Sequence, residues 1–195
     1  MLFLLGEKVV RRVSDEGSFH CPVCDSLQTS LHIIDKNYFT LFFIRILPLE
    51  IIGDYLECCQ CLHSFDPDNT TQPTYIPGLV LVLSYLMLGY GINNSKSEAA
   101  AIYKAMTDRE YDEQAIQDNI VAFNEGEDLF KTLKRLAFRL NTMGKIRVVE
   151  AAYLITRALS EVEYEDRLRV NLIGNALGIS LEFVNEIINR IKQIH

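Results

Sequence analysis

The sequence predicts an α+β chain, in which a small N-terminal β unit organised around a metal precedes an all-α bundle of about seven helices. Four of the five cysteines form two Cys-x2-Cys pairs in the first third of the chain. The hydrophobic spacing then changes from period two to period 3.6. The 195 residues, 49% of them hydrophobic and 23% charged, suffice for one or two domains. We expect a β domain at residues 1–66, a linker rich in proline and polar residues at 67–76, and a helical domain at 77–195.

The charge balance disfavours nucleic acid as a partner. The chain has 19 Lys and Arg against 26 Asp and Glu, a net charge of -7, and no run of five basic residues. The longest apolar stretches, residues 38–44 and 76–90, are shorter than the roughly 20 residues of a membrane-spanning helix. The opening residues 1–6 lack the basic region and cleavage site of a secretory signal. We therefore expect a cytoplasmic, reducing environment.

The cysteine spacing predicts a zinc site. Two Cys-x2-Cys pairs, Cys21 with Cys24 and Cys58 with Cys61, are separated by 33 residues. Such a pair on a tight turn directs two sulfurs at one ion, and two pairs complete a tetrahedral shell of thiolates that zinc favours. The long spacer suits a zinc ribbon, in which strands separate the pairs. We predict one structural Zn²⁺ on these four cysteines, with Cys59 outside the shell.

Other interpretations of the cysteines are core thiols, disulfides or a redox dithiol. A reducing environment disfavours disulfides, and neither pair is followed by the alternating strands and helices of a thioredoxin-like centre. His20 and His63 flank the pairs, but four thiolates already complete the shell. A filled shell offers no open position to a substrate, so the predicted zinc is structural and not catalytic.

The residues between the pairs predict strands. Residues 31–34 and 38–44 are rich in β-branched and aromatic side chains, Pro48 is expected to end the second run, and residues 51–56 read as the returning strand, with Gly53 marking a bend. A strand over residues 38–44 would carry apolar side chains on both faces, which is more than a thin ribbon buries. We expect the helical domain to cover the surplus face, or else a protein partner or a membrane surface.

Several segments carry a resemblance to a known family. The opening residues 1–6, Phe-His-Cys-Pro-Val-Cys at 19–24, the aromatic run at 38–44 with Leu-Pro-Leu at 47–49, and Tyr-Leu-Glu-Cys at 55–58 resemble the zinc-ribbon family of small prokaryotic proteins. The resemblance covers residues 1–66 and implies zinc binding without an assigned catalytic activity. Arg45 stands where the family has proline, and Cys59 and Leu62 replace the proline and glycine of the second knuckle.

A second zinc family has a related layout. In the lipopolysaccharide-induced tumour necrosis factor domain, an apolar stretch between two Cys-x2-Cys pairs enters the bilayer. Here Arg45, Glu50 and Asp54 lie within or beside the corresponding stretch, and burying them in lipid is costly. Contact with a membrane surface therefore stays a minor alternative.

The second half of the chain predicts helices. Their expected ranges are 78–89, 99–107, 113–123, 129–141, 146–159, 164–177 and 181–195. Ser95 and Glu98 form a capping-box pattern before the second helix, and residues 124–127 form a similar capping pattern before the fourth helix. Ser180 is the expected N-cap of the last helix. The loops are short, so neighbouring helices are expected to be antiparallel.

A weak internal repeat and the ending at residues 175–183, Asn-Ala-Leu-Gly-Ile-Ser-Leu-Glu-Phe, are similar to the tellurite-resistance TerB-like helical domain. That family carries acidic turns proposed to hold a metal. The corresponding turns here lack the aspartates, and one of them carries Lys145 and Arg147. We therefore do not assign a second metal site, and interpret Glu98 and Glu150 as carboxylates at helix N-termini, where the dipole favours them.

No catalytic constellation is apparent. His32 stands alone in a predicted strand, His195 ends the chain, and the nucleophile-elbow, phosphate-loop and dinucleotide motifs do not occur. We predict a protein that is not an enzyme: a zinc-binding interaction or scaffold protein of a stress response, with an unidentified protein partner. The alternative is a metal-responsive protein or enzyme using carboxylates of the helical domain. The minor alternative is membrane-surface association through the aromatic strand.

Overall fold

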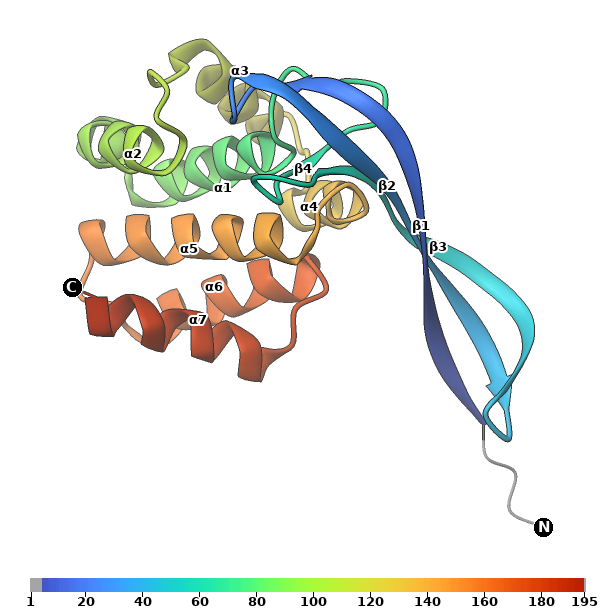
Figure 1. The fold of residues 1–195 in the computed structure, drawn as a ribbon. Helices are drawn as coiled ribbons and strands as arrows, with labels where there is room; N and C mark the ends of the chain where they lie inside the picture. Colours follow the sequence, from blue (N-terminus) through green and yellow to red (C-terminus); the bar gives the residue numbers. More distant parts are fainter. Residues whose placement is uncertain (1–4, 195) are drawn as a thin grey trace. The chain divides into compact units, whose positions relative to one another are not determined.

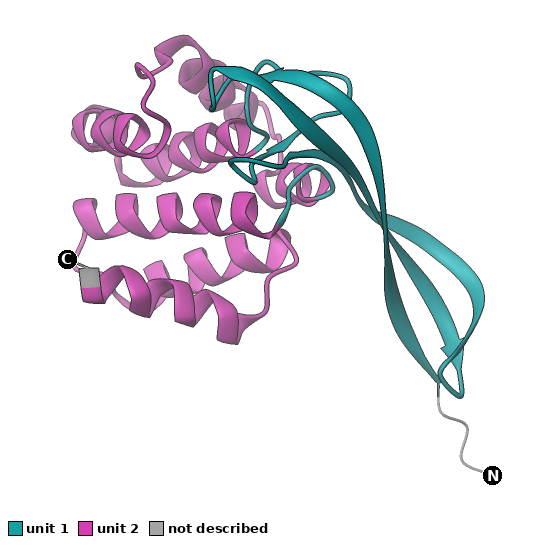
Figure 2. Cartoon of the chain, in the orientation of Figure 1, with its two compact units in different colours: residues 1–74, 138–141 teal, residues 75–137, 142–195 magenta. Residues whose placement is uncertain are grey.

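The computed structural model describes residues 5–194, which form four strands followed by seven helices (Figure 1). The predicted α+β class is therefore confirmed. The chain divides into two compact units (Figure 2): residues up to 74 together with 138–141, and residues 75–137 together with 142 onward. Residues 1–4 and His195, which belong to the predicted opening segment and last helix, lie outside the described residues.

The first unit is built on an antiparallel sheet. Its strands are β1 (Leu5–Cys21), β2 (Ser26–Leu41), β3 (Ile44–Cys58) and β4 (Ser64–Phe65), in the spatial order β1-β2-β3-β4. The strand β1 has no counterpart among the predicted strands. Most of its side chains are exposed on both faces, so it lacks the alternation of buried and exposed positions that identifies a strand in a sequence.

The aromatic segment differs from its prediction. The single strand expected at residues 38–44 is wrong: β2 ends at Leu41, Phe42 and Phe43 have φ of 48° and 66°, and β3 begins at Ile44. These apolar residues therefore occupy two strands and the turn between them. The surplus face expected on one strand does not exist in that form, because a β-rich composition does not distinguish a strand from a tight turn within it.

Pro48 does not end a strand, as had been expected, but lies inside β3, opposite Tyr38 of β2. Among the described residues β4 pairs with β3 only at Leu56 and Glu57, so Pro48 lies where β3 is an edge strand. The β2–β3 register also shifts on both sides of this pair. An edge strand with bulges tolerates a residue that has no N–H to donate.

The second unit is all-helical, and the prediction of about seven helices is confirmed. The helices are α1 (Tyr75–Tyr90), α2 (Ile92–Thr107), α3 (Glu113–Asn124), α4 (Leu129–Ala137), α5 (Thr142–Leu159), α6 (Tyr164–Ala176) and α7 (Leu181–Ile194). The apolar α1 packs against α2, α3 and α5, and α5 also packs against α6 and α7. The core between them includes Leu79, Leu83, Leu86, Ile155, Ile173, Leu177, Ile187 and Ile188.

The predicted helix starts agree with the structure in some helices and differ in others. Helix α2 begins at Ile92 and not at residue 99, and Ser95 lies inside it, donating its hydroxyl to the Gly91 carbonyl at 2.7 Å. Helix α4 is capped by Asp128, whose Oδ1 accepts the Phe130 N–H at 2.8 Å, and not by residues 124–127. At α7 the expected N-cap is present, because Ser180 Oγ accepts the Phe183 N–H at 3.3 Å.

Two carboxylates lie elsewhere than expected. Glu98 and Glu150 are inside α2 and α5, so their interpretation as carboxylates at helix N-termini is wrong. Burial raises the pKa of the Glu150 carboxyl group, and Arg147 and Arg190 partly oppose that rise. Sequence spacing placed these helix starts one or two turns too late, because the segments that extend the helices toward the N-terminus, residues 92–98 and 142–145, hold few apolar residues and therefore show no apolar periodicity.

Candidate metal centre

The four predicted ligands lie together in the first unit. The Sγ atoms of Cys21, Cys24, Cys58 and Cys61 are all within 4.8 Å of one another. Cys21 Sγ is 3.7 Å from Cys61 Sγ, and Cys24 Sγ is 3.9 Å from Cys58 Sγ. A disulfide bond measures about 2.0 Å, whereas a tetrahedral ion with bonds of about 2.3 Å holds its sulfurs about 3.8 Å apart. The cluster therefore has the dimensions of a site for one tetrahedral ion.

Strand ends position the ligands. The first pair spans the turn between β1 and β2, where Cys21 pairs with Ser26. The second pair begins at the end of β3, where Cys58 pairs with Ser30 of β2. Because β2 borders both strands, the two turns come together at the same end of the sheet. This placement brings together two cysteine pairs that are separated by 33 intervening residues in the sequence.

The two cysteine turns share a backbone feature. The residue after each second cysteine has a positive φ, 50° at Asp25 and 59° at Leu62. The Leu62 N–H donates to the Cys58 carbonyl at 2.9 Å and closes the second turn. Glycine adopts a left-handed backbone most easily. The zinc-ribbon family that this sequence resembles has glycine at this position. Leucine keeps the same turn at the expense of conformational strain.

An apolar shell surrounds the sulfurs. Cys21 and Cys58 are fully buried with Phe65, and Phe19 packs edge-on against the Phe65 ring with centroids 5.3 Å apart. Such a shell limits the access of water and of competing ligands to a metal. Cys24 and Cys61 are only half-buried, which leaves the other side of the cluster closer to solvent.

The thiols differ in their readiness to ionise. Burial raises the pKa of the Cys24 and Cys61 thiols. Burial acts in the same direction on Cys58, but the backbone N–H groups of Cys61 and Gln60 oppose it, and the pKa of Cys58 is lowered. Four close thiols resist losing all their protons, because each thiolate repels the next. A bound cation would compensate that repulsion, and these thiolate donors suit a soft or borderline ion.

The neighbouring candidates lie outside the cluster. Cys59 is exposed, and its backbone N–H donates to the Thr29 carbonyl at 3.0 Å. His20 is 65% exposed, with Nε2 4.0 Å from Asp25 Oδ1. His63 contributes its backbone carbonyl, which accepts the Cys58 N–H at 3.1 Å. The four-sulfur cluster thus consists of the cysteines that the spacing selected.

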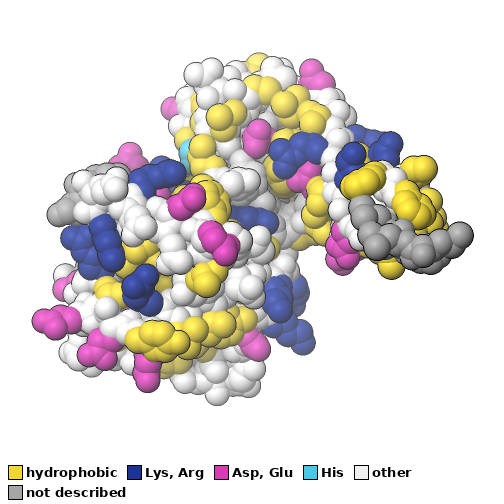
Figure 3. All heavy atoms as spheres, turned by 90° about the horizontal axis from the view of Figure 1, so that it is seen from below, with side chains coloured by type: hydrophobic (Ala, Val, Ile, Leu, Met, Phe, Trp, Pro, Cys, Tyr) yellow, Lys and Arg dark blue, Asp and Glu magenta, His cyan; other side chains and the backbone are white. Residues whose placement is uncertain are grey.

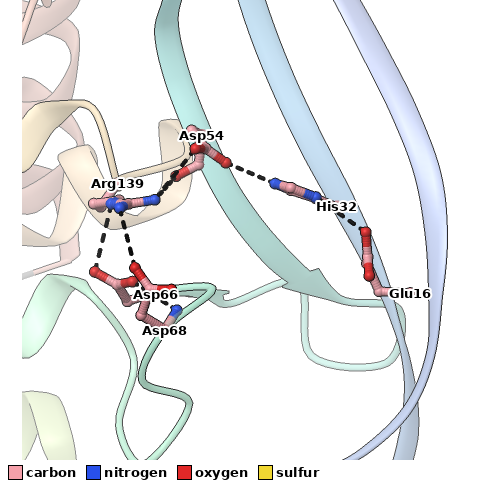
Figure 4. A network of polar contacts seen from close by, with 6 residues as sticks. All are labelled: Glu16, His32, Asp54, Asp66, Asp68 and Arg139. Atoms are coloured by element: carbon pink, nitrogen blue, oxygen red, sulfur yellow. Dashed lines mark hydrogen bonds and ion pairs between the residues drawn. The ribbon is translucent and has the colours of Figure 1, made fainter.

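Sequence reasoning missed a polar network in the same unit (Figure 4). His32 does not stand alone, as its isolation in the sequence had suggested: its Nε2 is 2.6 Å from Asp54 Oδ1, and its Nδ1 is 3.1 Å from Glu16 Oε1. The hydrogen bond with Asp54 raises the pKa of His32. Arg139 donates to the Asp54 carbonyl at 3.2 Å, and its guanidinium nitrogens lie 3.5 Å from Asp66 Oδ2 and 3.7 Å from Asp68 Oδ2.

Residues 138–141 belong to this unit although the sequence predicted them as the end of a helix. The Phe138 carbonyl accepts the Asp54 N–H at 2.9 Å. The Asn141 amide donates to Glu57 Oε2 at 2.7 Å and to the Leu62 carbonyl at 2.8 Å. Asn141 therefore holds the residue that closes the second cysteine turn. No local signal could have shown this, because the partners are about 80 residues apart in the chain.

One buried carboxylate of the helical unit is fully engaged. Asp166 is 8% exposed and accepts hydrogen bonds from the Tyr90 hydroxyl, from Ser160 Oγ at 2.9 Å and from the Glu163 N–H at 3.2 Å. Burial works against its ionisation, but these donors and Arg169 prevail and hold the pKa of Asp166 below its usual value. The side chain caps the first turn of α6, which accounts for its burial.

Comparisons with known proteins do not assign this chain to a family. No known protein family, curated protein or solved structure matches this chain. Within residues 5–194, no helix has the combination of length and hydropathy needed to cross a membrane.

Proposed function

We propose that the chain is a non-catalytic zinc-binding interaction module, in which a zinc ribbon accompanies a TerB-like helical unit. The observation that carries the proposal is the cluster of four cysteine sulfurs, with separations of 3.7 and 3.9 Å across the two turns. Thiolate donors in a tetrahedral arrangement favour zinc among the common divalent ions. Four protein ligands fill its coordination, so the metal stabilises the fold and does not activate a substrate.

The surroundings of the other polar groups support a role without catalysis. His32 lies between two carboxylates, Arg139 bridges three aspartates, and Asp166 caps a helix. Each of these groups has a structural explanation. The assignment of the helices as TerB-like follows from the resemblance at residues 175–183, and the Gly178 turn and Ser180 cap give that segment a defined local structure.

Metal analysis of the full chain after native purification tests the proposal. We expect one zinc per chain, and Cys58→Ser should lose it because the shell drops to three thiolates. Cys59→Ser is the matched control, since it alters a cysteine of the same turn that lies outside the cluster. Replacement of zinc by Co²⁺ should give the absorption bands of a tetrahedral tetrathiolate site.

Three outcomes would contradict the proposal: a purified chain without metal, an iron–sulfur chromophore, or zinc loss in Cys59→Ser as complete as in Cys58→Ser. A second, chelator-labile divalent ion that survives Cys58→Ser would instead favour the metal-responsive alternative, in which carboxylates of the helical unit bind the metal. The same metal analysis therefore separates both functions.

A further inference from the structure

The far end of the β2–β3 hairpin exposes an unusual amount of apolar surface. We call residues 5–9 and 36–49 the hairpin end. Between residues 41 and 49 the sole polar side chain is Arg45. The exposed apolar side chains of the hairpin end are Leu5, Val9, Phe42, Phe43, Ile44, Ile46, Leu47 and Leu49, and Phe43 is 79% exposed. Contiguous apolar surface of this kind marks an interaction site more often than a free surface.

The turn at this end is made from the wrong residues for its geometry. Phe42 and Phe43 both have positive φ, as in the two-residue hairpin turn that favours Asn-Gly. Bulky side chains adopt this conformation with steric strain. Because the turn by itself would select small residues, the two phenyl rings at its apex point to a role outside the hairpin fold.

The strand register places an apolar row of the hairpin end on one face, which also carries Glu7 opposite Phe39, and the cations on the other face. Residues paired across antiparallel strands share a face. Leu5, Leu41 and Ile44 form one row, and Phe39 pairs with Leu47 on the same face. The opposite face holds Lys8, Lys36, Tyr38 and Arg45, with the two cations of Lys36 and Arg45 lying 5.9 and 5.7 Å from the Tyr38 ring centre.

The charge of the hairpin end opposes that of the whole protein. The complete chain carries a net charge of -7, whereas the hairpin end has three cations, Lys8, Lys36 and Arg45, against the carboxylate of Glu7, with the exposed Glu50 bordering it on β3. The Glu7 carboxylate also accepts a hydrogen bond from Asn37 Nδ2 at 2.7 Å. Figure 3 shows basic and acidic side chains beside the hydrophobic ones in this region. A positive, apolar tip complements a negative surface that is itself apolar underneath.

We propose that the hairpin end docks on an anionic phospholipid bilayer, with Phe42 and Phe43 in the interface and Arg45, Lys8 and Lys36 facing the lipid phosphates. The bilayer would be the partner of the interaction module proposed above. The proposal depends on that function only because the ribbon must be folded to present the hairpin end. Strand β3 has unpaired backbone groups along its edge here, and such groups are excluded from hydrocarbon. Insertion is therefore limited to the turn and its neighbours, and the cations stay at the headgroup level.

The same features argue against a second copy of the chain as the occupant. Two hairpin ends packed through their apolar faces would leave Lys8, Lys36 and Arg45 on the outer faces, with no negative partner in the other copy. A bilayer supplies negative charge and accepts apolar side chains without matching them to polar groups. Charge complementarity thus selects the lipid surface.

Co-sedimentation of the zinc-loaded full chain with vesicles tests the proposal. We expect binding to vesicles of phosphatidylcholine with phosphatidylserine, weak binding to pure phosphatidylcholine, and release by added salt. The double variant Phe42→Asn, Phe43→Gly should fold at least as well, because it suits the turn, yet bind vesicles at least about tenfold more weakly. Tyr164→Ser, at a side chain of α6 that is 80% exposed, is the apolar control and should bind as the parent does.

The charge contribution has its own variants. Arg45→Gln and Lys8→Gln should each weaken binding to the anionic vesicles alone, whereas Lys131→Gln, an exposed lysine of α4, should not. Equal binding to neutral and anionic vesicles, or parental binding by the double variant, would overturn the proposal. So would self-association that the double variant abolishes without any vesicle binding. Zinc measured in the same samples separates the two failures, since lost binding with zinc retained contradicts the lipid proposal alone.

Discussion

The imidazole Nε2 of His32 on β2 lies 2.6 Å from Oδ1 of Asp54 on β3. The other ring nitrogen faces Glu16 of β1, so the ring links three strands through carboxylates. Among the described residues 5–194, the only other cationic side chain that contacts one of these carboxylates is Arg139. Its Nη1 lies 3.4 Å from Asp54 Oδ2. This arrangement stabilises the protonated ring, because two negative partners surround it.

The raised pKa of His32 predicts a pH-dependent stability. A group whose pKa is higher in the folded chain stabilises fully below its unfolded pKa of about 6.5, and that contribution disappears as the pH rises through the folded value. The difference in unfolding free energy between the parent and His32→Gln should therefore be largest in mildly acidic solution and shrink toward alkaline pH. Urea denaturation of the zinc-saturated proteins at several pH values measures it. A difference that stays constant from about pH 6 to pH 9 would contradict the prediction.

Asn141 should stabilise the metal site, although it lies far from the cysteines in the sequence. Asn141→Ala removes the donors to the Glu57 carboxylate and the Leu62 carbonyl, two acceptors near the second cysteine turn. Leaving such acceptors unpaired costs about 1–3 kcal/mol in stability. We expect faster transfer of zinc to a chelator, measured with a colorimetric dye. Parental release kinetics in this variant would show that residues 138–141 do not support the turn.

Gly174 should be intolerant of alanine, whereas Gly89 should accept it. A Cβ at Gly174 of α6 would press against the Val184 methyl group of α7, and a β-branched side chain on a helix has little freedom to move away. Gly174→Ala should destabilise the helical unit by about 1–3 kcal/mol. At Gly89 of α1 the nearest atom is 4.0 Å away, so alanine should stabilise by about 0.5–1 kcal/mol through helix propensity. Thermal denaturation followed by circular dichroism compares the two; equal effects would refute the packing argument.

Leu62→Gly should stabilise the second cysteine turn. Leucine there has a φ of 59°, and glycine adopts this backbone without steric strain. Relief of left-handed strain amounts to about 1 kcal/mol, which should appear as slower zinc release. Asp25→Gly in the first turn is the matched comparison, with a smaller gain, because aspartate tolerates a φ of 50° better than leucine does. A faster release in Leu62→Gly would mean that the leucine side chain contributes more by contact than it costs in strain.

The elements that the sequence predicted well depend on local patterns. The apolar spacing of 3.6 residues located the helices, since each one buries a continuous stripe against its neighbours. The cysteine pairs selected the four sulfurs of the cluster, because ligand spacing on a tight turn is itself a local feature. Ser180 was identifiable as an N-cap for the same reason.

The elements that it missed depend on residues distant in the sequence. The hairpin turn at Phe42 and Phe43 violates the residue preferences of its geometry, so no turn signal marks it. The exposed strand β1 has little buried face and therefore little periodicity. The partners of His32 and Arg139 come from different strands and from a segment about 80 residues away. Only the folded chain brings these groups together.

The placement of residues 138–141 in the first unit has a consequence for the order of synthesis. All the strands are made early, but the segment that pairs with Asp54, Glu57 and Leu62 leaves the ribosome only after α1–α4 have been translated. During that interval the nascent sheet carries its cysteines without the bonds that Phe138, Arg139 and Asn141 supply. Besides the contacts of His32 with Glu16 and Asp54, a metal on the four cysteines is a cross-link that the nascent sheet could acquire before its final segment arrives, and its capture would protect the ribbon while the helices are still being made.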